Sequence, residues 1–288
     1  MESKILSGKP VALSIIDRLK FKLADCRAIP TMALIRVGND PASAFYVQNI
    51  IKQGTKLGMD IRLIEVAESL SNGAFAKLVD QYNQNNDYHG IMIQKPLPKH
   101  IDETLIDNLV SPDKDIDGIN PINIGRLFLN QPSFVPCTAA AVIEILKFYQ
   151  IKTAKKNVVI LGRSSVVGKP LIGLLLQKHD FGNATVTVCH SHSKDIPSII
   201  RSCDIIIAAI GSPKFVTADM ISENTICIDV GINQILDAEK GAIYVGDIDY
   251  QTCLGKASAM TPVPGGIGSI TTSILLENLV IATLLQNH

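Results

Sequence analysis

The residues best suited to chemistry in this chain begin with a glycine loop, from Gly162 to Pro170, within NVVILGRSSVVGKP. The loop follows a short run of β-branched residues and precedes the apolar run LIGLLLQKH, which favours a helix. A strand, a glycine turn and a helix in this order aim backbone N–H groups and a helix N-terminus at a phosphate. The loop therefore predicts a phosphate-binding site, with a plain strand-to-helix turn as the alternative.

The spacing within the loop indicates which phosphate ligand it binds. A nucleotide triphosphatase loop has four residues between its glycines and then Lys followed by Ser or Thr. Here five residues separate Gly162 from Gly168, and Lys169 precedes Pro170. The standard dinucleotide fingerprint has a second glycine where this chain has Ser164. We interpret the segment as a variant dinucleotide-binding loop.

The end of the next predicted strand favours NADP over NAD. NAD enzymes usually place an acidic residue there to bind the ribose 2′-hydroxyl. This chain has the run CHSHSK, with no acidic residue before Asp195, and Ser191 supplies a hydroxyl. Arg163 in the glycine loop adds a planar guanidinium that suits a phosphate. Arg163 paired with a surface carboxylate is the alternative interpretation.

The elements that must position these residues alternate between strands and helices. Residues 29–93 predict a βαβαβ unit, with strands TMALIRV, IRLIEVA and GIMIQ and a helix over residues 43–57. Residues 97–136 are rich in Pro, Asp, Asn and Gly and predict ordered functional loops. A helix at 139–149 leads into a second run, with strands NVVILG, TVTVCHS, DIIIAAIG, TICIDVGIN and AIYVGDID before a final apolar helix. This order predicts a two-domain α/β protein with mainly parallel sheets.

Composition excludes several other classes of protein. The 288 residues are 47% hydrophobic and 19% charged, with a formal net charge of zero, so neither disorder nor a nucleic-acid or membrane-surface partner is expected. The longest uninterrupted apolar runs are shorter than the ~20 residues of a membrane span, and the N-terminus does not resemble a signal peptide. Six scattered cysteines suggest reduced thiols and a cytoplasmic protein. Cys189, His190 and His192 lack partner ligands at zinc spacing, so no metal site is predicted.

Taken together, the motifs resemble one family, the folate enzymes with methylenetetrahydrofolate dehydrogenase and methenyltetrahydrofolate cyclohydrolase activities. Eight blocks match in order: VGNDPAS with Tyr46, GIMIQKPLP, PDKDIDGINPINIGRL, PCT, VVILGRSSVVGKP, DVGIN, GDID and TPVPGGIG. The resemblance implies a homodimer and a folate cleft between two domains. The first is an N-terminal α/β catalytic domain of residues 1–138, completed by 266–288, whose C-terminal helix packs back on it. The second is a Rossmann-like NADP-binding domain of residues 139–265.

The resemblance also assigns site residues. It places Arg163 and Ser191 at the 2′-phosphate of NADP, and it places Tyr46, Gln94 and Asp117 at a reduced folate. The remaining coenzyme positions that it implies are Gly162, Ser164, Gly168 and Ile232. Without the family, Tyr46 has a simpler interpretation as helix core and Asp117 as a turn residue before Gly118.

One position departs from the family pattern. The family has a lysine one helical turn after the tyrosine, and this lysine handles protons when water adds to the methenyl cation. Here that position is Ile50, which can neither donate nor accept a proton. Hydride transfer depends mainly on alignment and should survive, whereas hydrolysis should fall by roughly 10²–10⁴-fold. The alternatives are a fully bifunctional enzyme that uses another residue for the water step and a non-catalytic folate or nucleotide binder.

Overall fold

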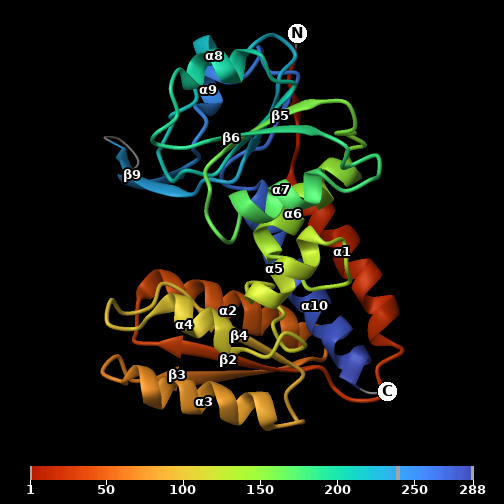
Figure 1. Ribbon diagram of the computed structural model, residues 1–288, viewed down its shortest axis with the longest axis vertical. Coiled ribbons are helices and arrows are strands. Elements are labelled where there is room, and N and C mark those ends of the chain that lie inside the picture. Colours follow the sequence, from red (N-terminus) through yellow and green to blue (C-terminus); the bar gives the residue numbers. More distant parts are fainter. Residues whose placement is uncertain (1, 238–240, 287–288) are drawn as a thin grey trace. The chain divides into compact units, whose positions relative to one another are not determined.

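The computed structural model describes residues 2–237 and 241–286 (Figure 1). The chain forms two compact units. One unit comprises Ile15–Val135 with Thr272–His288, and the other comprises Met1–Ser14 with Pro136–Thr271. Both are α/β structures built around parallel sheets, as the alternation of strands and helices predicts.

The first unit contains a three-stranded parallel sheet in the order β3-β2-β4. Its strands are β2 (Thr31–Val37), β3 (Asp60–Val66) and β4 (Gly90–Gln94). They alternate with α2 (Pro41–Lys56) and α3 (Asn72–Gln84), so the predicted βαβαβ unit is confirmed. All seven residues of β2 are buried because this strand is central and both faces of the sheet are covered.

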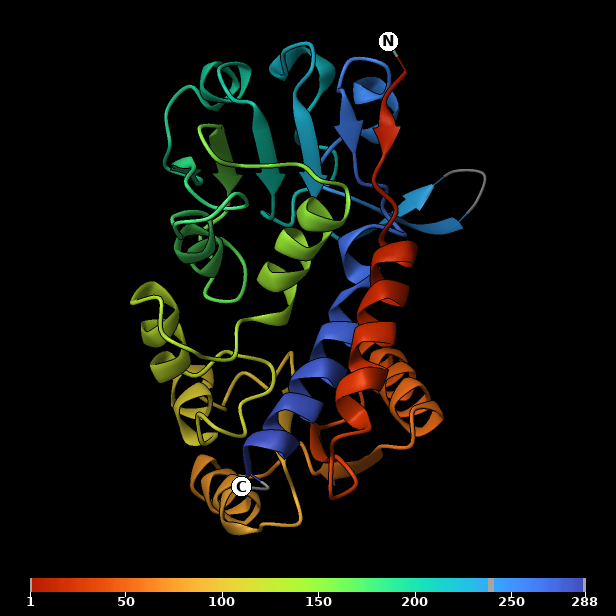
Figure 2. The ribbon, with the colours of Figure 1, turned by 90° about the vertical axis from the view of Figure 1, so that its right-hand side faces the viewer.

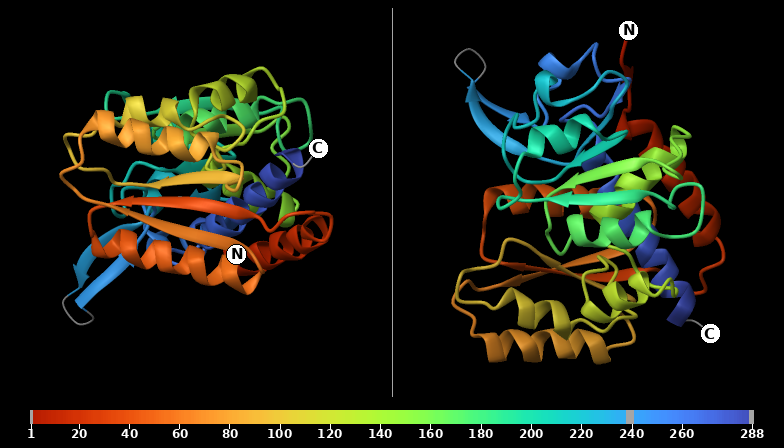
Figure 3. Two further views of the ribbon diagram at one scale, coloured as in Figure 1. Left: turned by 90° about the horizontal axis from the view of Figure 1, so that it is seen from below. Right: turned by 45° about the horizontal axis from the view of Figure 1, so that its top comes forward.

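Alternate residues of these strands face two different cores. Ala33, Ile35 and Val37 of β2 pack with Phe75 and Val79 of α3 on one face. The opposite face lies under α2 and α10 (Thr271–Gln286). There a Cβ on Gly54 of α2 would meet Ile61 and Leu276. Figure 3 shows α2 and α3 on opposite sides of the sheet. Two short helices, α4 (Glu103–Leu109) and α5 (Pro121–Phe128), complete the loop region of this unit.

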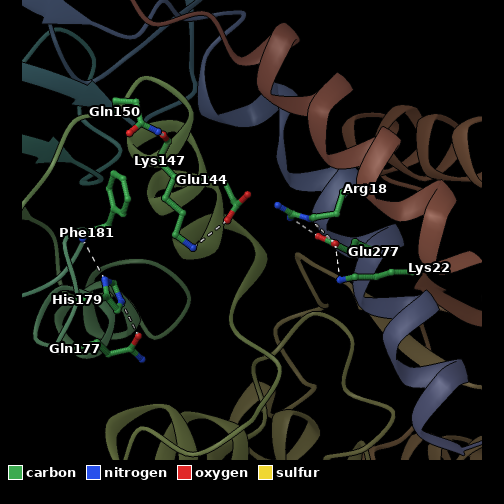
Figure 4. Close-up of polar contacts among 9 residues, drawn as sticks. All are labelled: Arg18, Lys22, Glu144, Lys147, Gln150, Gln177, His179, Phe181 and Glu277. Carbon is green, nitrogen blue, oxygen red and sulfur yellow. Dashed lines mark hydrogen bonds and ion pairs between the residues drawn. The ribbon is translucent and has the colours of Figure 1, made fainter.

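Ion pairs connect the C-terminal helix α10 to α1 (Gly8–Leu23). The buried Glu277 carboxylate pairs with Arg18 at 2.6 Å and with Lys22 at 2.9 Å (Figure 4). Residues 267–286 are long and apolar enough to cross a membrane by composition, although the sequence shows no uninterrupted apolar run of that length. About two thirds of the most apolar window, 67%, is buried within the protein, as expected of a core helix.

The second unit contains a six-stranded parallel sheet in the order β1-β11-β8-β7-β5-β6 (Figure 2). The strands are β1 (Lys4–Ile5), β5 (Asn157–Leu161), β6 (Thr185–Cys189), β7 (Ile205–Ala208), β8 (Ile226–Asp229) and β11 (Ala259–Met260). The chain proceeds outward from β5 to β6 and then returns to β7 on the other side of β5. Ligands bind at such a reversal, beyond the carboxyl ends of the strands, and β5 ends at the glycine loop.

The helices of this unit are α6 (Cys137–Phe148), α7 (Gly168–Leu175), α8 (Ile196–Arg201) and α9 (Tyr250–Cys253), with 3₁₀ turns at Ala218–Met220 and Ile267–Ser269. The segment AIYVGDID does not join the parallel sheet. It contributes β10 (Gly241–Val245), which pairs antiparallel with β9 (Asn233–Asp237) in a separate hairpin. The strand itself is therefore correctly predicted, but its partner is local because the two segments are separated by only a short stretch of chain.

Candidate functional site

Helix α2 presents Tyr46 and Ile50 on its inner side. The helix begins where the Asp40 carboxylate accepts a hydrogen bond from Ser43 N–H. Tyr46 is half-buried, whereas Ile50 is 0% exposed. The helix is regular from Pro41 to Lys56, and Lys52 is exposed. No bulge therefore turns Lys52 toward the position that Ile50 occupies.

Gln94 ends β4 at the carboxyl edge of the sheet. The residue is only 8% exposed, and its Nε2 donates to the carbonyl oxygen of Lys95. Its Oε1 is buried and has no hydrogen-bond partner among the described residues. Buried polar atoms are nearly always paired, so this acceptor is a feature that requires an explanation.

A buried carboxylate that the sequence analysis did not identify holds the loop that carries Asp117. Asp115 accepts hydrogen bonds from Ile119 N–H at 3.1 Å and Asn120 N–H at 2.8 Å, and from the Asn123 amide at 2.8 Å. Burial outweighs these bonds and raises the pKa of Asp115 to about 7. The block PDKDIDG contains this residue, but its spacing does not show which of its acidic side chains turns inward.

The loop is also fixed to its neighbours in the same unit. Lys114 O accepts from Ile91 N–H of β4 at 2.8 Å, and Ile116 O accepts from the Asn278 amide of α10 at 2.8 Å. The chain then turns at Gly118, whose φ of +74° favours glycine. Half-buried Asp117 therefore lies on a rigid segment beside β4. Tyr46, Gln94 and Asp117 all belong to this unit.

The glycine loop in the second unit has the geometry of a phosphate site. Gly162 adopts φ +112°, and its N–H donates to Cys189 O at 2.8 Å. A Cβ on Gly168 would lie 2.3 Å from the carbonyl oxygen of Gly162, so only glycine permits this close turn. Ser164 occupies the position of the missing glycine, and its Oγ accepts from Val167 N–H at 3.2 Å, immediately before α7. Arg163 is exposed.

A cavity of ≈ 320 Å³ adjoins this loop at the carboxyl ends of β5, β6 and β7. Its lining is mainly apolar and contains no carboxylate: Leu161, Cys189, His190, Ser191, Ile196, Ile210, Ser212 and Phe215. Such a lining suits a flat ring, with the exposed Ser191 as a hydroxyl donor. The nearby Asp195 carboxylate instead accepts from Ser198 N–H at the start of α8.

Two further buried carboxylates, also missed by the sequence analysis, shape this edge. Asp247 accepts from the backbone N–H groups of residues 210–212 at 2.6–3.0 Å and from the Asn233 amide at 2.8 Å. It thereby ties the cavity-lining turn after β7 to the segment beside the exposed Ile232. Asp229 accepts from three backbone N–H groups, and burial raises its pKa to about 7. The blocks DVGIN and GDID contain these residues.

No group of three or more His, Cys, Asp or Glu side chains within residues 2–237 and 241–286 could hold a metal ion. Cys189 is buried in the core of the second unit.

A glycine turn at the reversal point of a parallel sheet, with an apolar cavity beside it, defines a dinucleotide-binding α/β protein. Comparison with known proteins gives the family. Residues 6–117 match the catalytic domain, and residues 136–287 match the NAD(P)-binding domain, of the tetrahydrofolate dehydrogenase/cyclohydrolase family. The chain belongs to this family, which confirms the resemblance, the fold class and the class of cofactor.

Relatives and solved structures agree over nearly the full chain. The bifunctional protein FolD of Chlamydia felis is 42% identical over 276 residues, which are 95% of this chain and 96% of that protein. The FolD dehydrogenase/cyclohydrolase structure of Campylobacter jejuni has a TM-score of 0.92 at 37% identity, covering 98% of this chain and 99% of the other. The FolD structure of Trypanosoma brucei, complexed with NADP and an inhibitor, has a TM-score of 0.92 at 32% identity, covering 100% and 99%.

Proposed function

We propose that this protein oxidises 5,10-methylenetetrahydrofolate to 5,10-methenyltetrahydrofolate with NADP, and that it lacks an efficient hydrolysis of the methenyl product. The observation that carries the proposal is the buried, apolar Ile50 on a regular α2, in a unit that retains Tyr46, Gln94 and Asp117. The residues suited to alignment are present, whereas position 50 has no group that can transfer a proton.

The hydride step requires little from the protein besides geometry. Hydride leaves the one-carbon bridge, and the lone pair of an adjacent nitrogen stabilises the cation that remains. Asp117 accepts two N–H bonds from the amino edge of the pterin and fixes its register. Tyr46 offers a flat apolar face and a hydroxyl to the rings. Alignment of this kind supplies much of the barrier reduction in such a step.

The second unit has the residues to hold NADP, which accepts the hydride when bound. The backbone of Gly162, Ser164 and Gly168 would hold the pyrophosphate at the start of α7. Arg163 and Ser191 bind the 2′-phosphate, which no acidic side chain in the cavity lining repels. Ile232, which is exposed after β8, would contact the nicotinamide end of the bound coenzyme. We assign residues 139–265 to this function, and residues 1–138 with 266–288 to the folate, although residues 2–14 and 266–271 belong to the same compact unit as the six-stranded sheet.

We also propose a cytoplasmic homodimer. All six cysteines are free, as is typical of a reducing compartment. The β9–β10 hairpin exposes Leu236, at 88%, together with Tyr244, and an isolated two-stranded hairpin is marginal without a partner. Sedimentation of the purified chain tests this proposal, and a monomer at micromolar concentration would contradict it.

Two assays test the catalytic proposal. The first follows NADP reduction with the methylene substrate, and the second follows loss of the methenyl compound against its uncatalysed rate. We expect reduction together with near-background hydrolysis. Hydrolysis well above background, unchanged in Ile50→Ala, would instead support a fully bifunctional enzyme that uses another residue. A folded sample that binds folate but reduces no NADP would support a non-catalytic binder.

A further inference from the structure

A buried arginine lies beside Gln94 on the face of the sheet that α2 covers. Arg36 is the sixth residue of β2, and its register partners are Glu65 on β3 and Gln94 on β4. Partners in a parallel register point to the same face, so the three side chains form a row at the carboxyl edge. Ile61 lies four residues before Glu65 on β3, so its side chain points to the same face, where it packs under Gly54 of α2.

Two polar side-chain atoms in this row lack hydrogen-bond partners among the described residues. The Arg36 side chain is 9% exposed, and its Nη2 forms an ion pair with Glu65. Its Nε is buried without a hydrogen-bond partner among the described residues, and the same holds for Oε1 of Gln94. One atom is a donor and the other an acceptor. A buried polar atom without a partner is costly, so a complementary donor and acceptor on adjacent strands indicate a missing polar group.

Ile50, on the inner side of α2, supplies no such group. Ile50 is fully buried on α2 and has no polar atom in its side chain. The positive charge on this face therefore comes from the strand beneath the helix. A guanidinium also differs from an amine in chemistry, because it stays protonated at any physiological pH and donates through a rigid planar fork.

We propose that Arg36 is a substrate-binding residue of this chain, whose guanidinium donates a hydrogen bond to the ring carbonyl oxygen of the pterin beside Gln94. This inference rests on the proposed folate function and deepens it. Arg36 supplies charge and orientation on the face where Ile50 supplies neither. It cannot exchange a proton, so it supports alignment for hydride transfer and does not replace a base in hydrolysis.

The proposal predicts a specific recognition of the carbonyl group. A 4-amino pteridine presents N–H donors where a folate presents the carbonyl acceptor, so it should clash with the donors of Arg36. We expect the wild-type protein to bind tetrahydrofolate at least 10-fold more tightly than the matching 4-amino analogue. In Arg36→Met the affinities for the two ligands should differ by no more than about 2-fold. A purely structural role would weaken both ligands equally and leave their ratio unchanged.

Arg62→Met is the matched control. Arg62 lies on the neighbouring strand β3, with its register partner Ala33 on the opposite face from Arg36, and it pairs with Asp60 at 2.7 Å. We expect Arg36→Met to lower kcat/KM for methylenetetrahydrofolate by 10- to 100-fold, the range of a hydrogen bond to a charged group, with KM for NADP unchanged. Arg62→Met should remain within about 2-fold of wild type.

The outcomes separate this inference from the proposed function. An active wild type in which Arg36→Met retains both its kcat/KM and its preference for the carbonyl ligand overturns the role of Arg36. A wild type that reduces no NADP overturns the proposed function, and calorimetric binding of the two ligands still tests Arg36. If Arg36→Met does not fold, Arg36→Lys keeps a charge but loses the fork. An unchanged ligand ratio in a folded Arg36→Lys, together with wild-type kcat/KM, would also refute the assignment.

Discussion

Replacing Ile50 by lysine tests the physical basis of the proposed function most directly. Ile50 is fully buried, so burial of its side chain contributes roughly 1.5–3 kcal/mol that a lysine only partly recovers. A charged ammonium in this place would cost several kcal/mol more, so the introduced amine should titrate with a pKa below that of a free lysine. We expect the free energy of unfolding to fall by about 2–4 kcal/mol, as measured by urea denaturation.

Ile50→Met is the matched control because methionine resembles lysine in length and lacks the amine. A volume-conserving exchange of this kind usually costs less than about 1.5 kcal/mol. Hydrolysis of the methenyl substrate should be roughly 10²–10⁴-fold faster in Ile50→Lys than in Ile50→Met, which is the usual contribution of a positioned acid or base. The rate should also rise with pH as the amine loses its proton. NADP reduction should change by only a few-fold in either variant.

The assay follows the absorbance of the methenyl compound at several pH values, on samples whose folding is confirmed by circular dichroism. A folded Ile50→Lys that hydrolyses no faster than Ile50→Met would show that position 50 is not where the proton transfer fails. Equal acceleration in both variants would attribute the gain to the shape of the side chain and would refute the argument from proton transfer.

Three other predictions follow from buried groups. Asp115→Asn places an amide N–H₂ group among three hydrogen-bond donors and should loosen the loop that carries Asp117. We therefore expect the KM for folate to rise by about 10-fold, with the KM for NADP unchanged, in steady-state assays. Burial raises the pKa values of Asp115 and Asp229 to about 7, so the folded protein holds protons that the unfolded chain releases above about pH 4. Their contribution to stability should therefore fall as pH rises from about 4 to 7, and the melting temperature should change less over this range in Asp229→Asn. Gly168→Ala would place a Cβ 2.3 Å from the carbonyl oxygen of Gly162 and so distort the glycine loop. We expect the affinity for NADP, measured by fluorescence titration, to fall more than 10-fold. An unchanged affinity would contradict the phosphate-site geometry.

Much of the fold is determined by local patterns that the sequence displays directly. Runs such as TMALIRV and GIMIQ are continuous apolar segments bounded by turn residues, and they form the buried parallel strands β2 and β4. The glycine loop is recognisable because the close approach of Gly168 to Gly162 permits no side chain. The departure at Ile50 is likewise visible, since a residue four positions after Tyr46 must share its helix face.

Other features depend on contacts between segments that are far apart in the chain. Asp229 and Asp247 look like surface acids in the sequence, and only the folded chain brings them N–H donors from Ile248 and Ile210, which lie 19 and 37 residues away. The row of Arg36 and Gln94 likewise depends on strand register, which fixes neighbours 58 residues apart in sequence. Sequence determined which segments are strands, helices and glycine turns because those choices follow local periodicity and steric limits. Tertiary structure decided which polar atoms find partners, because that depends on which distant segments pack together and on how much water they exclude.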